Sequence, residues 1–150
     1  MARRVVRRLQ LAQPAARVFD ACLELLRTPD PARGVVARSV SPDPPAVDSV
    51  VRTTVRDRHG ERSLTATVVE LVPGELVATV TDSEPAVRTA LRCEPDGAGG
   101  TRVTLVSDAA GALSAFGRAG ALLDAALFAS GQRRAARATL RRVAELAARD

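Results

Sequence analysis

Residues 50–72 read VVRTTVRDRHGERSLTATVVELV, and this stretch decides the fold. Two runs rich in Val and Thr alternate apolar and polar side chains on either side of the turn signal His59-Gly60, a pattern typical of a β-hairpin. A two-residue loop there pairs Val55 with Leu64, which sets the register of the whole hairpin. The residues that this register places together on one apolar face are Val51, Thr53, Val55, Leu64, Ala66 and Val68.

The same period of two continues on both sides of the hairpin, from Gly34 to Asp108. Short runs of Val, Thr and Leu are separated by turn-forming clusters such as Pro73-Gly74. Loops this short predict antiparallel pairing, because a parallel crossover needs a dozen or more residues. The strands predicted in this region are 34–40, 47–57, 62–71, 75–82, 87–94 and 101–108.

The later strands extend the apolar face, with Leu91, Cys93 and Leu105 pointing inward. Which side chains point inward on the strand after Pro73-Gly74 depends on the length of the loop before it. A two-residue loop turns Val77 and Thr79 inward, whereas a three-residue loop turns Leu76, Ala78 and Val80 inward. We favour the second because it buries the larger side chains.

Helical patterns flank this sheet. A first strand is expected over Arg4 to Leu11, followed by an amphipathic helix over 15–27 that begins after Pro14. Beyond Ala109 the period returns to that of a helix, with an apolar stripe beside a row of arginines, and predicts a long terminal helix ending near Arg149. The expected fold class is therefore α+β, one domain over 1–150 with a curved antiparallel sheet of about seven strands wrapped on the C-terminal helix.

The composition argues against a nucleic-acid partner despite a net charge of +5 and a pI of about 11.0. The chain lacks Lys, Ile, Asn, Tyr and Trp altogether, which indicates a GC-rich bacterial genome that uses Arg in place of Lys. With only 2% aromatic residues, it also lacks the stacking platforms of single-strand binding grooves. The outward arginines are therefore interpreted as a solvated face.

Cys22 and Cys93 lie far apart without CxxC spacing, and His59 is the sole histidine, so no metal site is predicted. Two buried, reduced thiols and a cytoplasmic location are expected. The apolar stretch 109–131 is interrupted by Arg118 and Asp124, which argues against a membrane span.

Three segments resemble the START-like, or SRPBCC, superfamily, and in particular its polyketide cyclase/dehydrase-like members. They are QPAARVFD at 13–20, VELVPGEL at 69–76 and GGTRVTL at 99–105. The resemblance spans nearly the whole chain and implies the helix-grip fold with an internal ligand cavity. This sequence departs from aromatic-rich relatives, because its only aromatic residues are Phe19, Phe116 and Phe128.

The apolar face of the sheet is expected to lie opposite the terminal helix, and an apolar cavity is predicted between them. The residues expected to line it are Val51, Thr53, Val55, Leu64, Ala66, Val68, Leu91, Cys93, Leu105, Phe116, Leu123 and Leu127. Glu70 shares the parity of Val68 and is the one candidate polar group, although a rim position paired with an Arg is the commoner arrangement for such a residue.

The predicted function is binding of a small hydrophobic molecule, lipid-like or polyketide-like, as a carrier or sensor. The alternatives are an aromatase or cyclase acting on a polyketide-like chain, and a protein-interaction module without ligand, for instance a homodimer. No nucleophile signature, phosphate loop or carboxylate pair occurs, so no catalytic residue and no cofactor are predicted.

Overall fold

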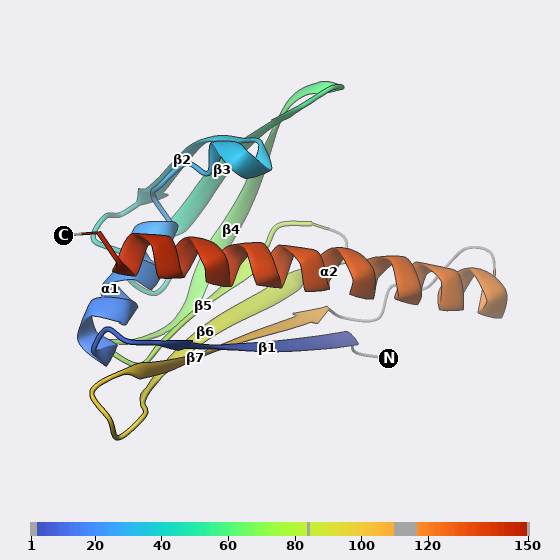
Figure 1. The fold of residues 1–150 in the computed structure, drawn as a ribbon. Helices are drawn as coiled ribbons and strands as arrows, with labels where there is room; N and C mark the ends of the chain where they lie inside the picture. Colours follow the sequence, from blue (N-terminus) through green and yellow to red (C-terminus); the bar gives the residue numbers. More distant parts are fainter. Residues whose placement is uncertain (1–2, 84, 110–116, 150) are drawn as a thin grey trace.

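A seven-stranded antiparallel sheet curves around one long helix (Figure 1). The computed structural model describes residues 3–83, 85–109 and 117–149. The elements in chain order are β1 (Arg3–Leu11), α1 (Ala15–Leu25), the 3-10 helix η1 (Pro31–Arg33), β2 (Val35–Ser41), β3 (Val50–Asp57), β4 (Gly60–Val72), β5 (Leu76–Thr81), β6 (Val87–Pro95), β7 (Thr101–Ala109) and α2 (Gly117–Ala147).

The spatial order of the strands is β1-β7-β6-β5-β4-β3-β2, and every neighbouring pair is antiparallel. β1 pairs with β7, so the first and the last strand of the chain are neighbours in the sheet. The predicted α+β fold with a curved antiparallel sheet and a C-terminal helix is confirmed.

The core lies between the sheet and the two helices. One cluster joins α1 and the C-terminal half of α2 to the inner faces of all seven strands. On β6 and β7 the side chains predicted to point inward do so, because Leu91, Cys93 and Leu105 are all buried in this cluster. The outward arginine of β3, Arg52, is exposed as predicted.

The β3–β4 hairpin turns one residue earlier than predicted. Asp57 pairs with Gly60, which leaves Arg58 and His59 as the two-residue loop and shifts the register by two, so that Val55 faces Arg62 instead of Leu64. The cause is local: the Asp57 Oδ1 accepts a hydrogen bond of 2.7 Å from the His59 backbone N–H, which starts the turn at Asp57.

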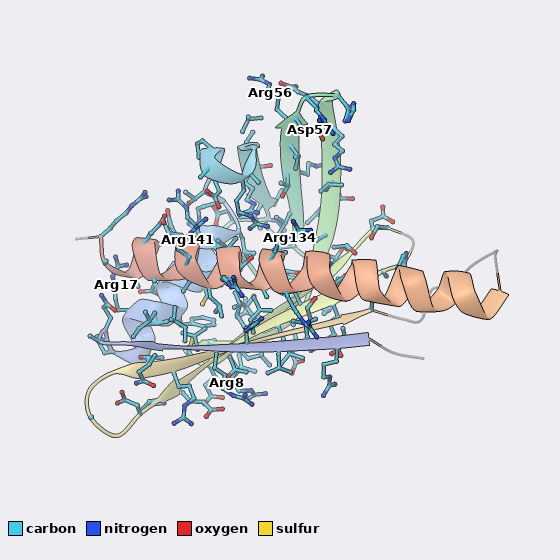
Figure 2. All side chains as sticks on the ribbon, turned by 45° about the vertical axis from the view of Figure 1, so that its right-hand side comes forward. Arg8, Arg17, Arg56, Asp57, Arg134 and Arg141 are labelled. Carbon is cyan, nitrogen blue, oxygen red and sulfur yellow. The ribbon has the colours of Figure 1, made fainter. Side chains whose placement is uncertain are left out.

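The tip of this hairpin projects beyond the helices, as Figures 1 and 2 show for the end that carries Arg56 and Asp57. Leu64 lies on the projecting part and is 46% exposed, so the prediction that it lines the cavity is wrong. Its parity was correct, because a shift of two residues preserves the face, but no helix covers the sheet at that position.

A β-bulge in β4 reverses the faces of the sheet beyond it. The pairing with β5 skips Val69, so Val68 faces Thr79 while Glu70 faces Ala78. Glu70 therefore points outward, where its Oε2 accepts a hydrogen bond of 2.7 Å from Nη2 of Arg88. The prediction of Glu70 as a cavity carboxylate is wrong, and a pairing with arginine on the outer face replaces it.

The same bulge also determines which side chains of β5 point toward the helices. The loop after Val72 has three residues, as favoured. The extra residue in β4 nevertheless reverses which side chains of β5 point toward the helices. Val77 joins the core and Thr79 turns inward, whereas Leu76 and Ala78 are buried in a small separate cluster with Ala90 on the other face. The inward orientation predicted for Leu76, Ala78 and Val80 is therefore wrong.

Candidate ligand cavity

A partly open cavity of about 160 Å³ lies between the middle of the sheet, the C-terminal end of α1 and α2. Its wall on the sheet includes short side chains, among them Ala66 and Thr89, which fill little of the space. The residues that line it are Leu25, Leu26, Arg38, Val51, Ala66, Val77, Thr79, Thr89, Leu91 and Thr139.

Three of the predicted cavity residues, Val51, Ala66 and Leu91, lie on the wall of this cavity. Val68, Cys93 and Leu105 are buried in the adjoining core and contribute packing to it. Thr53 and Val55 are half-buried on β3, where Thr53 pairs with the exposed Leu64 and Val55 pairs with Arg62 nearer the hairpin tip. Phe116 lies outside the described residues, as do the side chains of Leu123 and Leu127 on α2. Among the described residues, most of the lining thus comes from the central strands β3 to β6.

Arg38 is the lining residue with the most distinctive chemistry, and sequence reasoning missed it. It lies on β2 opposite Thr53, so its side chain enters the helix-covered side of the sheet. Nη1 donates a hydrogen bond of 3.0 Å to the carbonyl oxygen of Leu25, and Nε donates one of 3.4 Å to Oγ1 of Thr53. Burial lowers the pKa of Arg38 from its usual value. The available signal was its spacing of two from the buried Val40.

The remaining polar groups of the cavity are hydroxyls. Thr79 and Thr89 face each other across β5 and β6, and Thr139 comes from α2. Thr139 Oγ1 also accepts a hydrogen bond of 3.4 Å from Nη1 of Arg33. The cavity therefore combines an aliphatic wall with one cationic end, and no described lining residue is a carboxylate or an imidazole.

Cys22 on α1 and Cys93 on β6 meet in the core, with 3.9 Å between their sulfur atoms, and both are free thiols. The hydrogen bond with Cys93 and burial raise the pKa of the Cys22 thiol well above its usual value. A buried thiol of raised pKa is a poor nucleophile.

Cys22 is therefore expected to resist alkylation while the protein is folded. Iodoacetamide at pH 8 should leave it unmodified for hours and modify it completely in guanidinium chloride, as followed by peptide mass spectrometry. Leu105→Ala, which loosens the same core, is the matched variant and should speed the reaction in proportion to its loss of stability. Rapid modification of Cys22 in the folded parent protein would contradict the buried placement.

The sequence predicts neither a metal site nor a membrane span. In the part of the chain that the structure describes, no three His, Cys, Asp or Glu side chains gather closely enough to hold a metal ion. His59 lies exposed in the hairpin loop. Within the same residues, no helix has the length and apolar character that crossing a membrane requires.

The sequence of this chain was compared with models of known protein families. The family model described as "Polyketide cyclase / dehydrase and lipid transport" matches residues 2–148. The chain belongs to this family. The match covers almost the whole sequence and confirms the resemblance to the START-like, or SRPBCC, superfamily.

Solved structures of the same fold include the Zhui aromatase/cyclase from Streptomyces sp. R1128, with a TM-score of 0.77, 18% identity and coverage of 98% of this chain and 94% of that one. Ara h 8.0201 has a TM-score of 0.72 at 9% identity, with 98% of each chain covered. The di-domain aromatase/cyclase BexL from the BE-7585A biosynthetic pathway has a TM-score of 0.74 at 16% identity. There, 99% of this chain matches 51% of that one.

These structural similarities establish a shared fold. A search of curated protein sequences found no match.

Proposed function

We propose that this family member binds a small hydrophobic molecule, lipid-like or polyketide-like, in the cavity between sheet and helices, as a carrier or sensor. The observation that carries the proposal is the aliphatic lining by Leu25, Val51, Val77 and Leu91 of a partly open cavity between the sheet and the helices. Apolar surface left facing such a space gains free energy when an apolar ligand fills it. The family description, which includes lipid transport, supports the same function.

Native mass spectrometry of freshly purified protein tests the proposal directly. We expect a population that carries a small molecule of defined mass, which denaturation releases. Apolar probes should then compete for the site in the emptied protein. The proposal includes a cytoplasmic location, supported by the two free thiols of Cys22 and Cys93.

A polyketide aromatase or cyclase is the second candidate, favoured by the similarity to the Zhui and BexL structures. Such an enzyme could act by folding a reactive chain and orienting its carbonyl groups, which needs a shaped cavity more than a catalytic dyad. Conversion of a poly-β-ketone chain to a ring product faster than in buffer would favour it. A protein that shows no ligand, no turnover and a stable dimer would instead favour an interaction module.

A further inference from the structure

Arg38 brings a positive charge to one end of an otherwise aliphatic cavity. The two hydrogen bonds to Leu25 and Thr53 hold the guanidinium in place and use two of its five N–H donors. Arg38 forms no salt bridge within 4 Å to any carboxylate of the described residues, whereas Arg27, Arg56, Arg88 and Arg142 each do.

The groups around Arg38 add to the positive charge. Arg33 and Arg142 lie close enough to lower the pKa of Arg38, and the buried Asp30 opposes them. Arg142 has its own carboxylate partner, since its Nη1 lies 3.0 Å from Oε2 of Glu145. Arg38 therefore has two guanidinium groups and one carboxylate, that of Asp30, as its charged neighbours, and no hydrogen bond joins it to that carboxylate.

This charge restricts what can fill the cavity. A neutral apolar ligand would remove water from the guanidinium and leave N–H donors without acceptors, which is costly for a charged group. A ligand with an anionic oxygen supplies the missing acceptors and charge at the same moment. Arginine is well suited to this role, because its planar fork can donate two parallel hydrogen bonds to one carboxylate.

We infer that the cavity selects an amphipathic organic acid, with its carboxylate or similar acidic group against Arg38 and its apolar chain along Val51, Val77 and Leu91. The inference rests on the proposed ligand-binding function and narrows its ligand class. A cavity of about 160 Å³ is smaller than the roughly 300–1,000 Å³ of drug-sized ligand sites, so the acid is expected to be small.

Isothermal titration calorimetry at pH 7.5 with octanoate and 1-octanol as probes tests this inference. The two have chains of equal length, and only octanoate is charged at that pH. We expect the parent protein to bind octanoate at least about tenfold more tightly than 1-octanol, as a charge-assisted hydrogen bond allows. Arg38→Gln should abolish this preference while leaving the affinity for 1-octanol within about twofold.

Arg52→Gln is the matched control, because Arg52 is exposed on the outer face of the adjacent strand β3 and should leave both affinities unchanged. If Arg38→Gln does not fold, as judged by circular dichroism, Arg38→Lys replaces it. Lysine keeps the charge but loses the planar fork, so the preference should fall at least about threefold.

The outcomes separate the inference from the function on which it rests. Failure of both probes to bind the parent protein would overturn ligand binding itself. Binding of both with equal affinity would overturn the selection of an acid and leave the proposed function standing. A preference for octanoate that survives in the folded Arg38 variant would remove Arg38 as the anchor.

Discussion

Replacement of Leu105 by alanine is expected to lower the free energy of unfolding by about 2–5 kcal/mol, because it deletes a large aliphatic side chain from the core. Leu105 is 2% exposed and lies in the middle of β7, paired with Arg7 of β1 and Leu91 of β6. A typical domain has a total stability of only about 5–15 kcal/mol, so this single change should be plain in urea denaturation followed by circular dichroism.

Leu64→Ala is the matched control, since it makes the same chemical change on the exposed part of the β3–β4 hairpin. It should cost less than about 1 kcal/mol, because little surface is removed from water there. Equal losses for the two variants would contradict the placement of Leu64 outside the core.

The fold was predictable because its main signals are local and repeated. The change from strand to helix periods located the elements, and short turns such as Pro73-Gly74 forced antiparallel pairing. Along β6 and β7 the alternation is regular, so the buried Leu91, Cys93 and Leu105 followed directly from parity. Regular pairing across two neighbouring strands leaves little freedom for error.

The errors about Glu70 and about β5 arise where regular alternation breaks. The bulge at Val69 inverts the faces of β4 and β5, which moves Glu70 to the outer surface and Thr79 to the cavity. Val68, Val69 and Glu70 carry no turn signal, so their sequence alone does not disclose the extra residue. A second register shift lies in β2, between Val35 and Ala37, so Arg38 keeps its spacing of two from Val40 but not from the buried Val35.

Parity also says nothing about which part of an inner face a helix covers. Leu64 and Ala66 share a face of β4, yet Leu64 is exposed while Ala66 lines the cavity. The difference depends on where α1 and α2 end relative to the strands, which is a property of the tertiary structure. The cavity itself depends on the same placement, because it occupies the space between α1, α2 and the curved sheet.

Ala66→Phe is expected to weaken binding of 1-octanol by at least about 100-fold, equivalent to roughly 2.7 kcal/mol, by filling the cavity with its own side chain. Ala66 is suited to this test because its small side chain lines the cavity and its backbone is fixed by pairing with Val51 and Thr81. Overpacking should cost about 1–3 kcal/mol of stability, which a domain of ordinary stability can lose while remaining folded.

Thr65→Phe provides the control, since Thr65 precedes Ala66 on β4 and faces the hollow on the outer side of the sheet. It adds the same ring to the same strand and should leave the calorimetric affinity for 1-octanol unchanged. Circular dichroism and urea denaturation establish that both variants are folded. Undiminished binding in a folded Ala66→Phe protein would place the apolar ligand outside this cavity, because the added ring and the ligand cannot occupy one space of about 160 Å³ together.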